Sequence, residues 1–291
     1  MTAARERFRA ILDRDACTAA APIFDPLSAR IADMQGWEVC KLSGSFGKFA
    51  NLAVPDGINL ANMSDLVDLC WRINRVSESC LIVDADEGGG NALNVARTVR
   101  ELEAAGACAI EIEDNLVPQT FGQAARRHAL MVSQTEQVGK LEAAVAARRD
   151  PNTVIVARTS ALSELPREEA LRRLKAYSAT GAQALMFPEL PNGAADLPDI
   201  AASTHLPIFV LGLTPAAVRD EALLSSARVR IRFLPHLPYR MAVKAISDAF
   251  EHLRAAGTMD ELLSLTAPDH LLRAVDRTEE AEAWQKRFVR S

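Results

Sequence analysis

The chain has 291 residues, of which 49% are hydrophobic, and its 38 Asp and Glu residues outnumber its 33 Lys and Arg residues to give a formal net charge of −5. This length and apolar content allow one large α/β barrel or two modest domains with a full core. The mildly negative charge, without a long basic cluster, argues against a nucleic-acid partner. No apolar run approaches the roughly 20 residues that a membrane span requires, so we expect a cytoplasmic protein with no membrane partner.

The N-terminal segment and the cysteines fit the same expectation. Residues 1–14 are charged, are predicted to be helical and contain no apolar segment of the signal-peptide kind. The five cysteines, at positions 17, 40, 70, 80 and 108, are scattered and form no Cys-x-x-Cys pair. We predict that they are reduced residues of the core.

Short apolar runs alternate with longer amphipathic stretches along the chain. Eight runs are predicted to be buried strands, at residues 21–24, 38–42, 80–83, 108–112, 153–157, 184–187, 207–211 and 229–233. Helical periodicity is clearest at residues 66–76, 92–105, 137–147, 167–180, 215–227 and 238–256, and helices after the first and sixth strands have only weak signals. The alternation predicts a parallel sheet, and eight strands is the number in a (β/α)₈ TIM barrel. A doubly wound sheet is the alternative, but no Gly-x-Gly-x-x-Gly follows any strand.

The C-terminal segment, residues 258–291, follows the eighth predicted helix. It contains helical segments and Trp284, and a barrel does not need it. We predict a C-terminal helical extension that covers a partner subunit or the flank of the barrel. No repeat, low-complexity tract or linker divides the chain, so residues 1–291 are predicted to be a single barrel domain that includes this extension.

Polar residues are concentrated where the predicted strands end, which is where the active site of such a barrel lies. The third strand is followed by Asp84, Asp86 and Glu87 and then by three glycines, and alternation along the fourth strand places Glu111 and Glu113 on one face. Other strand ends carry Asp25, the Ser43-Gly44-Ser45 turn, Arg158 and His236. A purely structural barrel has no reason to collect these groups, so we predict an active site. A solvated acidic turn remains the alternative for the segment after the third strand.

The clustered carboxylates indicate a metal site. They repel one another, so such an array usually needs a cation, and oxygen ligands favour Mg²⁺, with Mn²⁺ as an alternative, over Zn²⁺. Asp84, Asp86 and Glu113 are therefore predicted to hold a divalent ion, partly through water. Arg158 is predicted to face them, either as a structural partner of the acids or as a clamp for a substrate carboxylate.

Two further groups are candidates for contacts with the substrate. The Ser43-Gly44-Ser45 turn offers N–H groups and hydroxyls that can hold an oxyanion, although an ordinary tight turn would have the same sequence. His236 has the side chain to exchange a proton near neutral pH. A structural role is the alternative for this histidine.

Taken together, these motifs resemble the isocitrate lyase / phosphoenolpyruvate mutase superfamily over nearly the whole chain. The matching segments are Ser43-Gly44-Ser45, Pro55-Asp56, Asp84-Ala85-Asp86 with Gly88, Gly90 and Asn91, Ile112-Glu113-Asp114, and Ala157-Arg158-Thr159. The resemblance implies a barrel whose last helix swaps between the subunits of a homodimer or homotetramer. It also implies Mg²⁺, an enolate intermediate and these roles: Asp84 as principal metal ligand, Asp56, Asp86 and Glu113 in support through waters, and Arg158 on the substrate carboxylate.

The segment after the fourth strand indicates the branch of the superfamily. The lyase branch carries a Lys-Lys-Cys-Gly-His motif there, whereas residues 115–123 of this chain are Asn-Leu-Val-Pro-Gln-Thr-Phe-Gly-Gln, and no cysteine follows Cys108. This segment and His236 resemble the oxaloacetate decarboxylase branch, which implies a carboxy-lyase acting on a small α-keto dicarboxylate, with Ser45, Asp84, Arg158 and His236 as contacts. The alternatives are a phosphonopyruvate hydrolase, a phosphonomutase, a methylisocitrate-type lyase, or a weakly active paralogue that binds a keto acid as a sensor or scaffold.

Two residues depart from the pattern of the family. Gly89 stands where the family often has an aromatic residue, so we expect one wall of the pocket to be lost. Glu87 adds an acid beside Asp86, and we expect it to compete for the metal or to repel a dicarboxylate.

Overall fold

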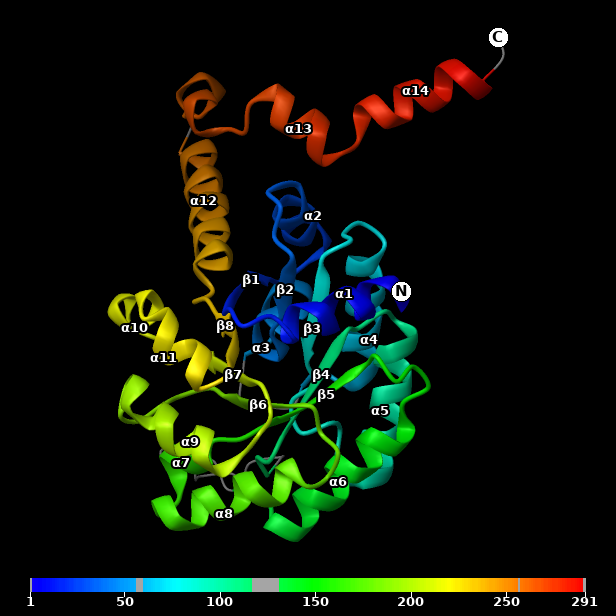
Figure 1. Ribbon diagram of the computed structural model, residues 1–291. Coiled ribbons are helices and arrows are strands. Elements are labelled where there is room, and N and C mark those ends of the chain that lie inside the picture. Colours follow the sequence, from blue (N-terminus) through cyan, green and yellow to red (C-terminus); the bar gives the residue numbers. More distant parts are fainter. Residues whose placement is uncertain (1, 56–59, 117–130, 256, 290–291) are drawn as a thin grey trace.

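Eight parallel strands form a closed barrel in chain order, and the last strand pairs with the first (Figure 1). The computed structural model describes residues 2–55, 60–116, 131–255 and 257–289. The strands are β1 Thr18–Ile23, β2 Val39–Leu42, β3 Cys80–Asp84, β4 Ala109–Glu113, β5 Val154–Arg158, β6 Ala184–Phe187, β7 Ile208–Leu211 and β8 Val229–Phe233. All eight predicted strands and the TIM-barrel prediction are confirmed, although β1 begins three residues before the apolar run that predicted it.

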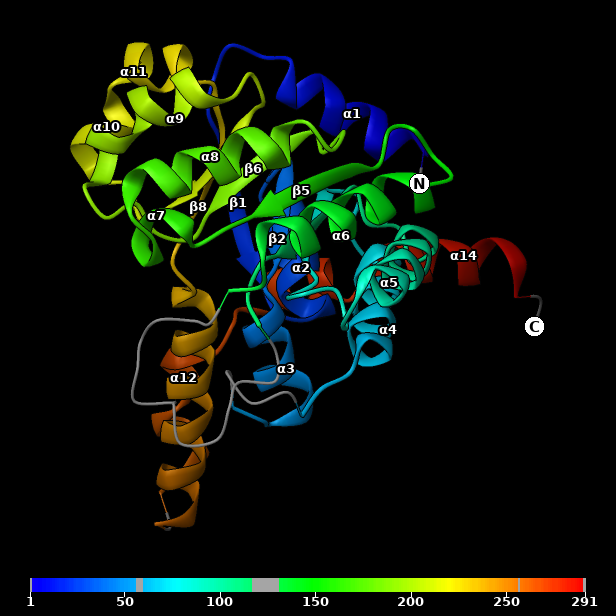
Figure 2. The same cartoon turned by 90° about the horizontal axis from the view of Figure 1, so that it is seen from below.

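Helices lie outside the barrel, and most of them surround it (Figure 2). They are α1 Thr2–Leu12, α2 Pro26–Met34, α3 Gly44–Leu52, α4 Met63–Asn74, α5 Ala92–Ala104, α6 Gln134–Ala147, α7 Ala161–Glu164, α8 Arg167–Ser178, α9 Leu197–Ser203, α10 Pro215–Arg219, α11 Glu221–Ser226, α12 Leu237–Arg254, α13 Asp269–Val275 and α14 Thr278–Phe288. The helix predicted at 215–227 is divided in two at Asp220, because the side chain of Asp220 accepts a hydrogen bond from the Leu223 N–H (2.9 Å) and so starts a new helix. The short helices α3 and α7 were not predicted, since neither has a full helical period of apolar residues.

The amino end of the barrel is closed by α1. Phe8, Ile11 and Leu12 are buried with the inward-facing residues of the strands, and the Phe8 ring packs edge-on against Phe209 at 6.3 Å between centroids. A second buried layer lies between the strands and the outer helices. With the amino end filled in this way, the carboxyl ends of the strands remain available for chemistry.

The cysteines belong to these apolar layers. All five thiols are free; Cys17 is partly buried and the other four are buried. Burial raises the pKa of Cys40 to about 12, so this thiol stays protonated at neutral pH. The prediction of reduced core cysteines is confirmed.

The last barrel helix and the C-terminal segment extend away from the barrel (Figure 1). No residue of α12 is buried, and it exposes large apolar side chains along its length: Leu237, Met241, Val243, Ile246, Phe250 and Leu253. The chain then returns toward α2, where Arg30 donates a hydrogen bond to the carbonyl of Ala274 at 3.3 Å. Within the described ranges, no helix has the length and apolar character needed to cross a membrane.

Candidate active site

A cavity of about 210 Å³ opens at the carboxyl ends of the strands. Its polar lining comes from four strands, β2, β3, β5 and β8, and the residues that follow them, and consists of Lys41, Ser43, Ser45, Asp84, Arg158 and His236. The remaining wall is mainly apolar and includes Leu211 and Phe233. The prediction that polar residues of separate strands meet at one end of the barrel therefore describes the geometry correctly.

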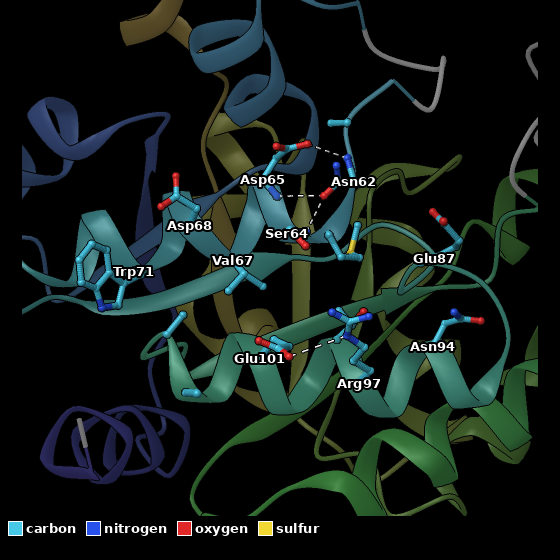
Figure 3. Close-up of a pocket in the computed structure, with 16 residues that line it drawn as sticks. Asn62, Ser64, Asp65, Val67, Asp68, Trp71, Glu87, Asn94, Arg97 and Glu101 are labelled. Carbon is cyan, nitrogen blue, oxygen red and sulfur yellow. Dashed lines mark hydrogen bonds and ion pairs between the residues drawn. The ribbon is translucent and has the colours of Figure 1, made fainter.

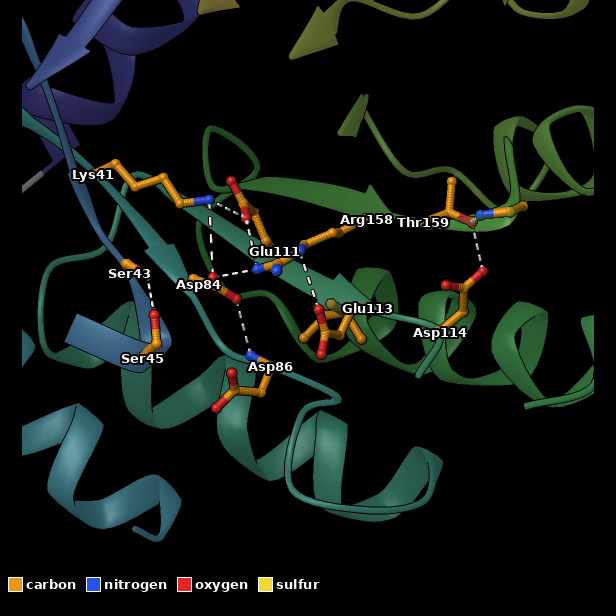
Figure 4. A network of polar contacts seen from close by, with 12 residues as sticks. Lys41, Ser43, Ser45, Asp84, Asp86, Glu111, Glu113, Asp114, Arg158 and Thr159 are labelled. Carbon is orange, nitrogen blue, oxygen red and sulfur yellow. Dashed lines mark hydrogen bonds and ion pairs between the residues drawn. The ribbon is translucent and has the colours of Figure 1, made fainter. Parts of the chain in front are cut away.

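Arg158 is the centre of the charged network in this cavity (Figure 4). Its Nη1 donates a hydrogen bond to Asp84, and its Nε lies 3.0 Å from Oε2 of Glu113. Strand register explains the meeting, because Glu113 pairs with Arg158 across β4 and β5, and Asp84 pairs with Glu111 across β3 and β4. The prediction that Arg158 faces the acids holds in this geometry.

Lys41 is a second cation in the network and was not predicted. Its Nζ donates a hydrogen bond to Oε2 of Glu111 at 2.5 Å and lies 4.0 Å from Oδ2 of Asp84 (Figure 4). Both Lys41 and Glu111 are buried. The sequence did contain a signal for this residue, because a lysine inside the apolar strand Val39–Leu42 must be buried, and buried charges are normally paired or functional.

The electrostatic surroundings keep Asp84 ionised. Burial acts to raise its pKa, but the charges of Arg158 and Lys41 outweigh burial and hold the pKa well below its usual range. Burial raises the pKa values of Glu111 and Glu113, and the nearby cations oppose that effect only in part. Asp84 is therefore the carboxylate of the network with the most firmly held negative charge.

Asp86 lies on a tight turn directly after β3. It adopts a left-handed backbone conformation (φ 48°), its carbonyl accepts a hydrogen bond from the Glu113 N–H (2.8 Å), and its carboxylate lies 2.5 Å from Nζ of Lys48. Burial, followed by the charge of Asp84, raises the pKa of Asp86 to about 7. Gly88 continues the turn at φ 82°, where a Cβ would lie 2.6 Å from the Val95 side chain, so the turn requires glycine at this position.

The donors around Asp84 fit a hydrated divalent cation. Asp84, Asp86 and Glu113 offer only oxygen atoms, and Oε1 of the nearby Glu111 is buried without a hydrogen-bond partner. No three His, Cys, Asp or Glu side chains in the described part of the chain converge closely enough to coordinate an ion directly. This arrangement suits Mg²⁺, which keeps several waters and binds through one or two carboxylates, better than an ion that needs a closed protein cage.

Glu87 and Gly89 face away from the cavity. Both line a separate groove of about 910 Å³ between α4 and α5 (Figure 3). A Cβ at position 89 would lie 2.9 Å from the Met63 side chain, which lines the same groove. The expectations that Glu87 competes for the metal and that Gly89 removes a wall of the pocket were therefore wrong, because the turn directs both residues to the outer side of the barrel.

The Ser43-Gly44-Ser45 turn starts α3 at the edge of the cavity. The two serine hydroxyls lie 3.1 Å apart, and the first backbone hydrogen bond of the helix runs from Gly47 to Ser43 (3.1 Å), so the preceding N–H groups have no partner within the helix. A Cβ on Gly44 would lie 2.5 Å from Oδ1 of Asp86. The turn therefore packs directly on the acidic turn after β3 and can present N–H groups to an anion.

His236 lines the cavity immediately before α12. Burial, with a further contribution from the charge of Lys41, lowers its pKa to about 4. The imidazole is therefore neutral at pH 7, where it can donate or accept one hydrogen bond on each nitrogen but carries no positive charge. This differs from the expectation of a histidine that exchanges a proton near neutral pH.

Several motif residues support the site from outside the cavity. Asp25 caps α2 by accepting a hydrogen bond from the Ser28 N–H (2.7 Å), and Asn91 caps α5 in the same manner. Asp114 accepts hydrogen bonds from the hydroxyls of Thr159 (2.7 Å) and Tyr177 (2.8 Å), which ties β4 to the end of β5. Tyr177 was not predicted, because its role depends on contacts between α8 and the barrel. Asp56 and residues 117–123 of the branch segment lie outside the described residues.

Comparisons with known proteins match this chain over nearly its whole length. The family model described as phosphoenolpyruvate phosphomutase matches residues 8–254. An oxaloacetate decarboxylase of Paraburkholderia xenovorans (strain LB400) is 38% identical over 288 residues, which cover 99% of this chain and 94% of that protein. A second oxaloacetate decarboxylase, from Rhodopseudomonas palustris (strain BisB18), is 42% identical over 273 residues, or 94% of this chain and 92% of that protein. The crystal structure of a phosphonopyruvate hydrolase in complex with oxalate and Mg²⁺ has a TM-score of 0.83 at 30% identity and covers 99% of both chains.

The lowered pKa of His236 predicts a specific pH dependence of stability. The folded state binds a proton at this side chain only below about pH 4, whereas the unfolded state binds one below its ordinary value of 6.5. Between these values the unfolded state holds more protons, so this contribution to stability is present above pH 6.5 and is lost as the pH falls toward 4. Urea unfolding of the wild type and of His236→Asn, from pH 7.5 to 4.5, should show a shallower loss of stability in the variant. Parallel curves for the two proteins would contradict the assignment.

Proposed function

The chain belongs to the phosphoenolpyruvate phosphomutase family, and on this basis we propose that it is a Mg²⁺-dependent carboxy-lyase that decarboxylates oxaloacetate to pyruvate through an enolate. The single observation that carries the proposal is that Arg158, which lines the cavity with Asp84 at the carboxyl end of the barrel, contacts both Asp84 and Glu113. The relatives named oxaloacetate decarboxylase, which match nearly the whole chain, favour this substrate over others.

The proposed metal ligand is Asp84, with Asp86, Glu113 and Asp56 in support through water. When it is bound, Mg²⁺ supplies positive charge that stabilises the developing enolate oxygen. The firmly ionised state of Asp84 supports its role as the direct ligand, since a metal ligand must be deprotonated. The raised pKa of Asp86 and its ion pair with Lys48 suit a group that acts at a greater distance from the ion.

Arg158 and the Ser43-Gly44-Ser45 turn are proposed to orient the substrate. The planar guanidinium matches the two oxygens of the C1 carboxylate, and the N–H groups at the start of α3 approach the same anion. The substrate is then held while the C3–C4 bond breaks, CO₂ leaves, and the electron pair of that bond passes into the enolate of pyruvate. A proton added at C3 completes the reaction.

His236 is proposed to assist as a neutral group. In that form it donates a hydrogen bond to the leaving C4 carboxylate or to the enolate oxygen without the strong ground-state attraction of a full charge. The apolar wall that includes Leu211 and Phe233 limits water near the reacting atoms, which strengthens the remaining polar contacts.

The outward position of Glu87 bears on the rival functions. A weakly active sensor or scaffold was an alternative because Glu87 and Gly89 would disturb the metal site. Both residues line the groove between α4 and α5 instead, so this argument for a sensor or scaffold no longer applies. The solved structures that this chain resembles include a phosphonopyruvate hydrolase, so substrate assays must separate the phosphonopyruvate hydrolase, phosphonomutase and methylisocitrate-type activities from decarboxylation.

We also propose that the chain forms a homodimer or homotetramer in which a neighbouring subunit covers α12. Met241 and Phe250 on α12 are 70% and 69% exposed, which is unusual for apolar side chains on a helix that follows a barrel strand. Light scattering should give a mass above that of one chain, and the pair Met241→Asp and Phe250→Asp should reduce it. Glu251→Gln on the same helix serves as the control. A single-chain mass for the wild type would rule out this assembly.

The function is tested by pyruvate formation from oxaloacetate. We expect turnover with Mg²⁺, its loss with EDTA and its recovery when Mg²⁺ is added back. Because oxaloacetate also loses CO₂ slowly without enzyme, Asp84→Asn at the same concentration gives the background. Phosphonopyruvate and methylisocitrate should be poor substrates. Full activity in EDTA, or faster turnover of phosphonopyruvate, would sink the proposal, and oxalate binding by calorimetry without any turnover would favour a binding protein.

The clamp is tested by Arg158→Lys, which keeps a positive charge between Asp84 and Glu113 but removes the fork that fits a carboxylate. Charge-assisted hydrogen bonds to a carboxylate are worth about 1.5–3 kcal/mol, so the KM for oxaloacetate should rise by about tenfold to a hundredfold. Arg97→Lys, on the exposed face of α5, is the matched control. An unchanged KM in Arg158→Lys would show that the guanidinium only balances the acids.

A further inference from the structure

Lys41 is a buried cation placed where the cavity meets the interior of the barrel. Its side chain is 7% exposed, its Nζ lies 4.0 Å from the centroid of the Phe233 ring, and it lines the same cavity as Asp84 and Arg158. Burial of an ammonium group costs free energy even when it is paired, and an apolar pair in place of Lys41 and Glu111 would often be at least as stable. The position therefore calls for a role beyond the packing of the strand.

The ammonium group of Lys41 has hydrogen-bonding capacity beyond its contact with Glu111. It carries three N–H donors, and the hydrogen bond of 2.5 Å to Oε2 of Glu111 uses one of them. Asp84 lies 4.0 Å away, beyond hydrogen-bond distance, and the Phe233 ring interacts with the charge rather than with a single N–H. A ligand oxygen that enters the cavity can therefore bind to Lys41 without breaking its pair with Glu111.

Lys41 and Arg158 form a pair of neighbouring cations in the described lining of the cavity. The two groups lie close together, since Lys41 Nζ is 2.5 Å and Arg158 Nη1 is 3.8 Å from the same atom, Oε2 of Glu111. No other lysine or arginine lines this cavity within the described residues, and His236 is neutral at pH 7. Once a divalent ion offsets the nearby carboxylates, each of these two cations can donate a hydrogen bond to one carboxylate of a small dianion.

We propose that Lys41 binds the second carboxylate of the substrate and makes the site selective for four-carbon dicarboxylates over monocarboxylates. This inference rests on the function proposed above, in which Arg158 holds the C1 carboxylate, so the C4 carboxylate is the group left for Lys41. Its charge contributes mainly to binding. As the C3–C4 bond breaks, the C4 carboxylate becomes uncharged CO₂ and its electron pair moves into the enolate, so the contact is strongest before the chemical step.

The experiment compares two ligands that differ at the distal group. Malate and 2-hydroxybutyrate are both 2-hydroxy acids of four carbons, and a methyl group in the second replaces the distal carboxylate of the first. Their dissociation constants are measured by calorimetry on the Mg²⁺-loaded protein. The wild type should prefer malate, and Lys41→Met should weaken malate binding by about tenfold or more while leaving 2-hydroxybutyrate and oxalate nearly unchanged.

Two further variants separate recognition from structure. Glu111→Gln breaks the same ion pair but keeps the ammonium group, so it should retain the preference for malate. The double variant Lys41→Met with Glu111→Gln leaves no buried carboxylate without its partner, and it should lose the preference as Lys41→Met does. The proposal is overturned if the wild type shows no preference, if the double variant keeps it, or if Glu111→Gln loses it to the same extent.

Kinetics on the same preparations distinguish this proposal from the proposed function. If oxaloacetate is turned over, Lys41→Met should raise the KM by about tenfold or more without lowering kcat. A preference for malate that depends on Lys41 in a protein without decarboxylase activity would contradict only the proposed function. Decarboxylase activity with an unchanged KM in Lys41→Met would contradict only the role of Lys41.

Discussion

The accumulation of carboxylates at the carboxyl ends of β3 and β4 is the constraint on which the rest of the site depends. Asp84, Glu111 and Glu113 are all buried there, and burial of each negative charge would cost free energy without a cation nearby. Arg158 and Lys41 supply part of the balance, and their charges keep Asp84 ionised in spite of its burial. The same excess of negative charge makes this end of the barrel suited to a divalent ion, and the ion in turn would allow an anionic substrate to bind.

Most of the fold could be predicted from the sequence, because a buried parallel strand is a short apolar run and the barrel repeats that signal eight times. The structure confirms the closed barrel. The family match and the relatives named oxaloacetate decarboxylase confirm the family resemblance and the prediction of an enzyme. The short helix α3 and the division at Asp220 escaped prediction, since local capping and packing decide them rather than a long period of apolar residues. The assignment of residues 1–291 to a single domain stays a prediction.

The site was predictable to the extent that its residues lie at strand ends. Alternation along β4 correctly placed Glu111 and Glu113 with Arg158. Lys41 was missed because it lies inside a strand, and Glu87 was misplaced because the left-handed conformation of Asp86 sends the following residues to the outside of the barrel. The direction of a side chain after a tight turn depends on backbone angles that residue type alone does not specify. The metal and substrate roles of these residues stay proposals.

The pairing of β1 with β8 has a consequence for how this chain matures on the ribosome. Each strand of the barrel contacts its successor, but β1 obtains its second neighbour only when Val229–Phe233 has been made. Until then the two edges of the nascent sheet stay unpaired and Lys41 lacks the Phe233 ring beneath its charge. His236 comes three residues after β8, so the ribosome makes this cavity residue directly after the last strand. A chain that is truncated before this point therefore has neither a closed sheet nor a complete cavity.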